Sequence, residues 1–477
     1  MNVNTTVTAD TLDDVHYMSL TDLGEAIRTR AISPVEVTEA MLSRIEAVDG
    51  ELKSYLTVLP DHARAAAQTA QAELDAGLWR GPLHGVPIAV KDLCETTYAP
   101  TSAGMKIHAE YIAEQDSTVV SRLDKAGAVM LGKLTMTEGA MSGHHPDMKT
   151  PLNPWKASAW TGASSSGSGA ATAAGLCFGS LGSDTGGSIR LPSTACGLTG
   201  VKPTWGRVSR AGVFALADSL DHVGPMCRTA SDAAAMLATI AGPDPRDPTT
   251  LTAPVPDYMG ALGGSIAGLR IGLDEEYVFG GTDPQVAAMM RDTIEVLTDL
   301  GAVFVPISFP SMADISPNWI AICTAECAAA HKDTYPRRNN EYGPMLTWVI
   351  ETGLALTPVQ LAEALQYRLK ICGAIARDTD GVDVLLVPGI GCTLMDADVW
   401  AVPPDQQPAD TLGQIIRYTA VFDMTGQPTI SLNGGVDAAG LPMGFQLVGK
   451  HLDEATLLKA GHAFQSVTGW HTQHPSL

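Results

Sequence analysis

The spacing of hydrophobic positions near the amino terminus is typical of α-helices. In "SPVEVTEAMLSRIEAVDG" they recur every three or four residues, which places them on one helical face. Ser33 can cap the start of this helix, Pro34 suits its first position and Glu36 completes a capping box. Gly50 is expected to end it. A second helix of alanines and charged residues is expected over residues 61–77.

After residue 81 the pattern changes to short apolar runs with a period of two. In "GVPIAVKD", Val86, Ile88 and Val90 alternate with other positions, which predicts a strand that ends at Lys91. The run "GAVMLGK" at 127–133 predicts another strand.

Two longer stretches follow these strands. Residues 139–163 contain Gly, Pro, His and Trp without periodicity and are expected to form a long ordered loop, of a kind that is often functional. Residues 162–180 run from a Gly/Ser loop into an Ala-rich stretch, whose small side chains suit a helix packed closely on a sheet.

Strand and helix signals alternate again beyond a Pro/Gly-rich stretch. Apolar runs occur in "LRIGLD", "AVFVPIS", "VDVLLVP" and "PTISLNG", and a helix is expected to open near Pro284. This alternation predicts an α/β fold in which helices cover both faces of a sheet. We expect one compact domain made of an N-terminal helical segment (1–80), a core (81–241), a Pro/Gly-rich linker (242–265) and a C-terminal α/β part of the same sheet (266–477).

Composition limits the partners and the location. The 477 residues are 45% hydrophobic and carry a net charge of −22, from 52 acids against 30 Lys and Arg. No cluster of five or more basic residues occurs, so nucleic-acid binding is not expected. The N-terminus lacks the features of a secretory signal and no stretch is apolar enough to span a membrane, so the protein is expected to be cytoplasmic, without a membrane partner. The eight Cys form no CxxC pair and are expected to be buried reduced thiols.

Candidate chemistry concentrates at three places: Lys91 at a strand end, the serine triplet 164–166, and Ser188 in "GSDTGGSIRLPS". A P-loop does not fit, because Ser168 follows the glycine pair where that motif needs Lys. A nucleophile elbow does not fit either, because Arg190 stands where its last Gly would be.

The histidines suggest no catalytic partner. His222 directly follows Asp221 and is interpreted as an ordinary polar loop residue. His144, His145 and Asp147 have metal-binding side chains, but one short motif in a loop is weak evidence, and we interpret them as solvated. No metal and no cofactor is expected.

A lysine can act as the base instead if it is neutral. A free lysine has a pKa of about 10.4, so burial must lower it by roughly three units before the amine accepts a proton near pH 7. Lys91 follows an apolar strand, where such burial can occur.

The runs "GVPIAVKD", "TPLNPW", "GASSSGSGAATAAG" and "GSDTGGSIRLPSTACGLTGVKPTWGRVSR", in this order, closely resemble the amidase signature family. The separation of 24 residues between Ser164 and Ser188 also fits. The resemblance extends to "DMTGQPTISLNGGVDAAGLPMGFQLVG" near the C-terminus, so it covers nearly the whole chain. It implies the α/β amidase-signature fold, a large mixed twisted sheet with helices on both faces, and hydrolysis of amide C–N bonds.

The resemblance implies a Ser-cisSer-Lys triad. Ser188 would be the nucleophile, Ser164 the bridging serine after a non-proline cis peptide bond, and Lys91 the general base. The chain departs from the family at Ala163 and Ser166, where Gly is common. Both replacements are small and are expected to tune the pocket.

The residues around this triad also receive roles from the resemblance. Ser165 would help to position the lysine, and Asp184 and Arg190 would hold the loop rather than react. The oxyanion hole would be formed by the backbone N–H groups of Thr185, Gly186, Gly187 and Ser188.

The substrate is expected to be a small amide or carbamate, because methionines and aromatic residues near the site suggest an apolar, adaptable pocket. Anilides, alkyl amides and carbamates (urethanes) are favoured, and small polar amides stay open. The oligomeric state, monomer or homodimer, stays open as well. The candidate pocket residues are Tyr98, Met105, Met141 and Trp155, with Met136 and Trp160 as further possibilities.

Two other functions are considered. The glutaminase-type subunits of glutamine-dependent tRNA amidotransferases share "KPTWGRVSR", but where they have an acid for the glutamine amino group this chain has Ile416. A non-enzymatic binding protein on the same fold would have lost part of the triad, and all three residues are present. A hydrolase that works alone is therefore favoured.

Overall fold

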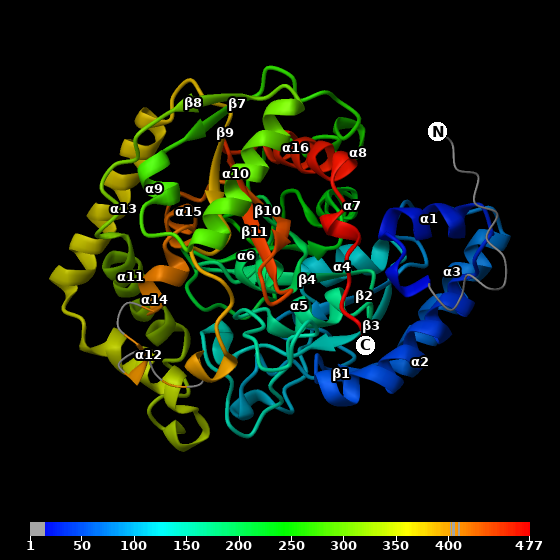
Figure 1. Ribbon diagram of the computed structural model, residues 1–477. Coiled ribbons are helices and arrows are strands. Elements are labelled where there is room, and N and C mark those ends of the chain that lie inside the picture. Colours follow the sequence, from blue (N-terminus) through cyan, green and yellow to red (C-terminus); the bar gives the residue numbers. More distant parts are fainter. Residues whose placement is uncertain (1–14, 401, 403–405, 409–410) are drawn as a thin grey trace.

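The computed structural model describes residues 15–400, 402, 406–408 and 411–477 (Figure 1). Residues 1–14, whose sequence lacks the features of a secretory signal, lie outside the described part. Eleven strands form one mixed sheet in the order β1-β3-β2-β4-β6-β5-β10-β11-β9-β7-β8. The strands are β1 (Tyr55–Val58), β2 (Pro87–Lys91), β3 (Val129–Leu134), β4 (Gly179–Asp184), β5 (Thr199–Lys202), β6 (His222–Cys227), β7 (Arg270–Leu273), β8 (Val303–Pro306), β9 (Val384–Pro388), β10 (Thr429–Val436) and β11 (Pro442–Gly449).

Sixteen α-helices surround this sheet in the described part of the chain. They are α1 (Leu20–Arg28), α2 (Pro34–Leu52), α3 (Pro60–Asp75), α4 (Thr118–Lys125), α5 (Ser166–Ala173), α6 (Arg190–Cys196), α7 (Ala230–Ile240), α8 (Tyr258–Ala261), α9 (Glu275–Phe279), α10 (Pro284–Asp299), α11 (Ile315–Ala330), α12 (Pro344–Ala355), α13 (Pro358–Asp378), α14 (Thr411–Ile416), α15 (Ala420–Thr425) and α16 (Glu454–Val467).

The first predicted helix is present but ends later than expected. The Ser33–Glu36 capping box starts α2, which continues through Gly50 to Leu52. The side chain of Leu52 is buried, and Lys53 adopts the left-handed conformation that ends the helix, with φ at 57°. Burial of the last turn thus outweighs the weak helix preference of a solvent-exposed glycine.

The predicted strands at β2, β3, β7, β8, β9 and β10 are confirmed, as are the helix at α3 and the helix that opens at Pro284. The Ala-rich stretch forms α5, all of whose residues are buried. The prediction for His222 is wrong, because this residue begins β6, where it pairs with Asp184 of β4 and is buried. A strand of small and mixed residues between two buried neighbours has no alternating pattern by which it could be found.

Helices pack on both faces of the sheet, as predicted. Gly461 of α16 lies against Ile430 and Leu432 of β10, whereas Gly197 at the end of α6 lies against Asn433. Successive strand residues point to opposite faces, so α16 and α6 lie on opposite sides. Strands from before and after the 242–265 stretch belong to this one sheet, since β5 pairs with β10.

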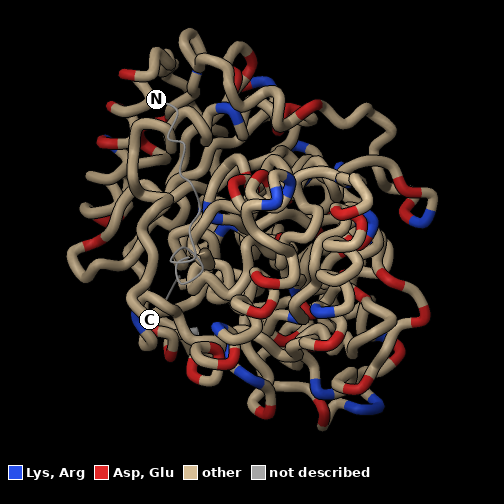
Figure 2. The backbone as a smooth tube through the Cα atoms, turned by 90° about the vertical axis from the view of Figure 1, so that its right-hand side faces the viewer, with Lys and Arg blue, Asp and Glu red and all other residues tan. Residues whose placement is uncertain are grey.

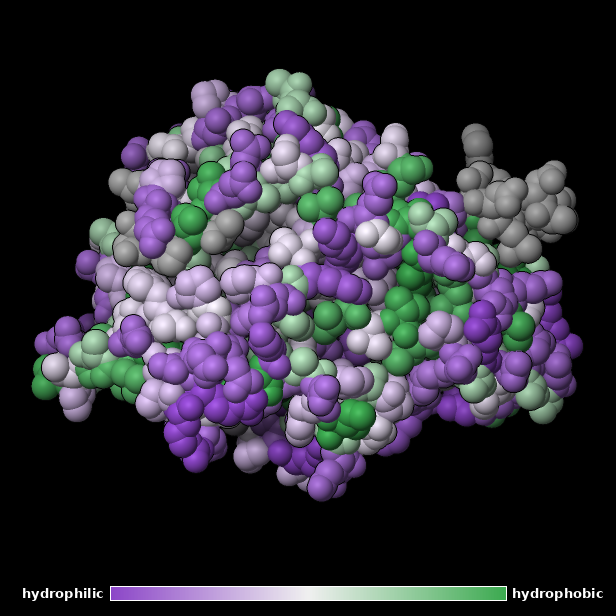
Figure 3. All heavy atoms as spheres, turned by 90° about the horizontal axis from the view of Figure 1, so that it is seen from below, coloured by the Kyte–Doolittle hydropathy of each residue, from purple (hydrophilic) through white to green (hydrophobic). Residues whose placement is uncertain are grey.

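The surface is acidic without a basic face. Figure 2 shows Asp and Glu dispersed around the molecule with Lys and Arg among them. On the face in Figure 3, hydrophobic side chains form small groups separated by hydrophilic ones. No single described helix is long and apolar enough to cross a membrane; α12 and α13 reach that length and composition only together, and they are bent by 99°. All eight cysteines are free, six of them buried, while Cys372 and Cys392 are partly exposed.

Candidate active site

The candidate site forms where two neighbouring strands end. β2 and β4 are parallel and adjacent, so their carboxyl ends lie at the same edge of the sheet. Lys91 is the last residue of β2, and Asp184 is the last residue of β4. The loop with Ser164 precedes α5, which packs on both strands. Segments far apart in the sequence therefore meet at one point.

Lys91 is fully buried and donates hydrogen bonds to three serine hydroxyls. Its Nζ lies 2.7 Å from Ser164 Oγ, 2.9 Å from Ser165 Oγ and 2.8 Å from Ser183 Oγ. Burial lowers the pKa of the Lys91 ammonium to about 7, although Asp184 and other nearby groups act in the opposite direction. An amine with this pKa is available as a base near neutral pH.

Ser183 was not among the residues predicted from the sequence. It lies in the quoted glycine-rich run but outside any known site pattern, and only the strand geometry of β4 brings it to Lys91. Ser165 accepts the Ser183 N–H at 3.2 Å and donates to the Ser183 carbonyl at 3.2 Å. The position of Ser165 beside the lysine agrees with the supporting role expected for it.

The peptide bond between Ala163 and Ser164 is cis, as the resemblance implied. The Ser164 hydroxyl has no acceptor among the described residues, so its proton can point toward the cavity. Ser188 lines that cavity and is partly exposed. Its hydroxyl makes no hydrogen bond to another described residue, and thus Lys91 and Ser164 are in contact whereas Ser164 and Ser188 are not hydrogen-bonded.

The loop before Ser188 is held by the Asp184 carboxylate. Asp184 accepts the Gly187 N–H at 2.6 Å and the Ile189 N–H at 3.0 Å. The Gly187 N–H, expected in the oxyanion hole, is therefore already paired in this structure. The N–H groups of Gly186 and Ser188 have no acceptor among the described residues.

Asp184 and Arg190 belong to a buried ion network. Arg190 contacts Asp184 at 2.9 Å and Asp423 of α15 at 2.6 Å, and all three side chains are fully buried. Burial opposes ionisation of Asp184, but Arg190 and Lys202 hold the pKa of this carboxyl well below its usual range. Burial raises the pKa of Asp423 well above its usual range. The sequence offered no sign of Asp423, which lies more than 230 residues from Arg190.

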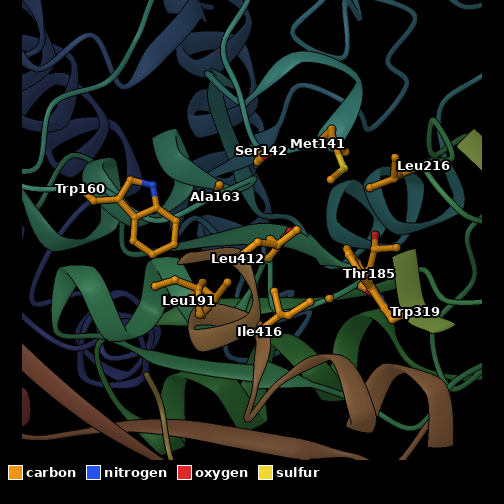
Figure 4. Close-up of a pocket in the computed structure, with 14 residues that line it drawn as sticks. Met141, Ser142, Trp160, Ala163, Thr185, Leu191, Leu216, Trp319, Leu412 and Ile416 are labelled. Atoms are coloured by element: carbon orange, nitrogen blue, oxygen red, sulfur yellow. The ribbon is translucent and has the colours of Figure 1, made fainter. Parts of the chain in front are cut away.

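The cavity beside Ser188 is apolar. In Figure 4, Met141 and Leu216 lie on one side, Leu191 and Ile416 on the other, and Trp319 near Thr185. The described lining residues include no acid, lysine, arginine or histidine. They are Ala140, Met141, Ser142, Trp160, Ala163, Thr185, Gly186, Ser188, Leu191, Leu216, Trp319, Leu412, Ile415 and Ile416.

Only part of the predicted pocket is found around this cavity. Met141 and Trp160 line it, whereas Tyr98, Met105 and Trp155 do not. Tyr98 stacks on a histidine of α3, Met105 is fully buried, and the Trp155 indole donates to a backbone carbonyl at the end of α6. Met136 is also core. The walls that sequence reasoning missed come mainly from α11 and α14, which lie far along the chain.

A second cavity adjoins the first and shares Ser142 and Trp160 with it. His144 lines this second cavity, and its Nε2 lies 3.1 Å from Ser166 Oγ. Burial lowers the pKa of His144 to about 4, so the imidazole is neutral at ordinary pH. The described lining residues of this cavity also include no acid, lysine or arginine.

The interpretation of His144 and His145 as solvated is wrong. His144 is largely enclosed, and the buried His145 accepts the backbone N–H of Asp147 at 3.0 Å. The Asp147 side chain instead pairs with Lys106 at 2.6 Å on the surface. No group of three or more potential metal ligands occurs in the described part of the chain.

The fold and this serine–lysine cluster at the strand ends define an amidase. The chain belongs to the amidase family, whose model matches residues 36–458, and it is a hydrolase acting on C–N bonds. AmiD of Mycobacterium tuberculosis, a protein named as an amidase, is 45% identical over 464 residues, 97% of each chain. The A-type polypeptide of the glutamyl-tRNA(Gln) amidotransferase of Chloroflexus aurantiacus is 38% identical over 98% of this chain and all of its own. The structure of a bacterial aryl acylamidase superposes with a TM-score of 0.86 at 25% identity, covering 96% of this chain and 97% of that one.

Proposed function

We propose that the protein is a serine amidohydrolase for neutral amides with apolar groups, and that it uses Ser188, Ser164 and Lys91. The Ser188 hydroxyl attacks the substrate carbonyl carbon, and its proton passes through Ser164 to Lys91. The proton returns by the same route to the leaving nitrogen as the C–N bond breaks. Water then hydrolyses the ester on Ser188 and releases the acid. If the substrate is a carbamate, CO2 leaves from the released acid.

The hydrogen bonds around Lys91 support Ser164 as the proton relay. A neutral lysine has two N–H donors and one lone pair. The Ser165 proton is already donated to the Ser183 carbonyl, so Ser165 can only accept from Lys91. Ser164 retains its proton for exchange with the Lys91 lone pair at 2.7 Å.

The neutral cavity carries the substrate assignment. A buried apolar wall discriminates poorly between similar apolar groups, but it strongly disfavours a charged group that finds no partner. Ile416 lies in this wall, where the tRNA amidotransferases were expected to have an acid for the glutamine amino group. The aryl acylamidase with the same fold agrees with an apolar substrate. Anilides, alkyl amides and aryl carbamates therefore fit better than glutamine.

A hydrolysis panel tests this function. An anilide, an aliphatic amide, an aryl carbamate, an ester and glutamine are offered to the purified protein and to Ser188→Ala and Lys91→Met. We expect the anilide or carbamate to be the best amide-type substrate, and both variants to lose at least about 10⁴-fold in kcat. Ser466→Ala, an exposed serine on α16, is the matched control and should keep full activity.

Two results would overturn the proposal. Full hydrolysis by Ser188→Ala would exclude this nucleophile. A preference for glutamine over the anilide would favour the alternative that the 38% identical amidotransferase polypeptide represents.

A further inference from the structure

Two successive peptide groups before Ser188 are tethered through their carbonyl oxygens. The indole Nε1 of Trp319 donates to the Thr185 carbonyl at 2.9 Å, and the Thr419 hydroxyl donates to the Gly186 carbonyl at 2.6 Å. Trp319 is on α11, and Thr419 immediately precedes α15. Neither residue has a counterpart in the signature runs of the sequence.

Each tether also fixes the direction of the next N–H group. Both peptides are trans, and the C=O and N–H of a trans peptide point in opposite directions. The Thr419 tether therefore directs the Gly187 N–H away from Thr419, where Asp184 accepts it. The Trp319 tether directs the Gly186 N–H away from the indole, and this N–H has no acceptor among the described residues.

The packing leaves no room for another loop conformation. A Cβ atom on Gly186 would collide with the Trp319 ring, and a Cβ atom on Gly187 would lie 2.8 Å from the Thr419 hydroxyl. Thr419 is fully buried, and Trp319 is nearly so. Figure 4 shows Trp319 beside Thr185 at the cavity wall.

We propose that Trp319 and Thr419 are positioning residues that orient this backbone, so that the Gly186 and Ser188 N–H groups, and not that of Gly187, receive the oxyanion. The inference rests on the proposed acyl transfer at Ser188. Gly187 then has a different role, in which its N–H anchors the loop to Asp184. The hole is thus set by α11 and by the segment before α15, outside the glycine-rich run itself.

Thr419→Val removes the hydroxyl with little change of shape and tests the proposal. We expect kcat to fall about 10- to 100-fold, as for a displacement of about 1 Å at a reacting group, while KM changes less than about threefold. Trp319→Phe should lower kcat similarly, with a larger effect on KM because the ring also forms the wall. Thr419→Ser, which keeps the hydroxyl, should restore most of kcat.

A tetrahedral-adduct inhibitor separates positioning from general damage. The inhibition constant of phenylboronic acid should rise by the same factor as kcat/KM falls, whereas that of the product aniline should not change. Thr324→Val is the matched control, because Thr324 is a buried threonine on α11 whose hydroxyl has no partner among the described residues.

Unchanged kcat and boronate affinity in both Thr419→Val and Trp319→Phe would overturn the proposal, and so would an equal loss in Thr324→Val. The separate result of Ser188→Ala decides the proposed function. Loss of activity in Ser188→Ala with full activity in the tether variants would reject the tethers alone.

Discussion

At the scale of single residues, Lys91 shows how burial converts an ordinary lysine into a base. Its ammonium is removed from water and receives only serine hydroxyls as direct partners, with no carboxylate in contact. A salt bridge would have held its pKa high and kept it protonated. The neighbouring Lys133 illustrates the contrast, because it is equally buried but pairs with Asp92 at 3.2 Å.

The pH dependence of activity follows from this difference. Because Lys91 must be neutral to accept a proton and its pKa is lowered to about 7, kcat/KM should rise with pH and be half-maximal near pH 7. The profile is measured with a neutral anilide between pH 5 and 9. Its plateau is expected above about pH 8.

Asp221 provides a control for this profile. Burial raises the pKa of its carboxyl to about 6, and its negative charge opposes deprotonation of Lys91. Asp221→Asn removes that charge, so the rise should persist with its midpoint at lower pH. A flat profile, or a midpoint that moves upward in Asp221→Asn, would contradict Lys91 as the base.

Sequence reasoning reached some of these residues for identifiable reasons. Lys91 was found because a period of two marks its strand, and Ser164 and Ser188 because their runs resemble a family signature. Ser183 and Asp423 were missed, since a serine on a strand and an acid on a short helix look the same whether or not a lysine or arginine faces them. Their roles come from tertiary contacts only.

At the scale of elements, the substrate cavity is built by segments that the signature does not include. α14 contributes Leu412, Ile415 and Ile416, and α11 contributes Trp319. Periodicity predicted the main strands, because each has a local pattern. It could not predict which helix would face Ser188, because helices of similar composition are interchangeable until the chain has folded.

Leu412 on α14 offers a test of this wall. Leu412→Ala removes apolar surface that an anilide or alkyl amide would cover, at a cost of about 1–2 kcal/mol in binding. We expect kcat/KM for a bulky apolar amide to fall roughly tenfold, mainly through KM. An acetyl amide of the same amine should lose much less.

Leu354 serves as the comparison, because it is a leucine on α12 with 62% of its surface exposed. Leu354→Ala should leave both substrates unaffected. An equal loss of both substrates in Leu412→Ala would show that α14 does not contact the substrate.

At the scale of the whole molecule, Arg190 connects the two halves of the chain behind the site. Besides Asp184 and Asp423, its guanidinium contacts the Thr419 carbonyl at 3.0 Å and Gln446 of β11 at 3.3 Å. The glycine-rich loop and the C-terminal strands are thereby fixed to one side chain. Sequence reasoning predicted a loop-holding role for Arg190 and Asp184, but not that the partners would come from the C-terminal part.

The last prediction concerns the stability of this arrangement. Arg190→Met keeps most of the side-chain volume but leaves the Asp184 carboxylate buried without its main cation. Breaking one side of a buried ion pair typically costs about 3–5 kcal/mol, because the remaining charge stays desolvated. The free energy of unfolding, measured by urea denaturation at pH 8, should fall by roughly that amount. Arg28→Met, which breaks an exposed pair with Glu25, should cause no measurable change. Since burial already favours the neutral form of Asp423, Asp423→Asn should destabilise the protein less than Arg190→Met. The opposite order would mean that Asp423, and not Asp184, is the charge that Arg190 chiefly compensates.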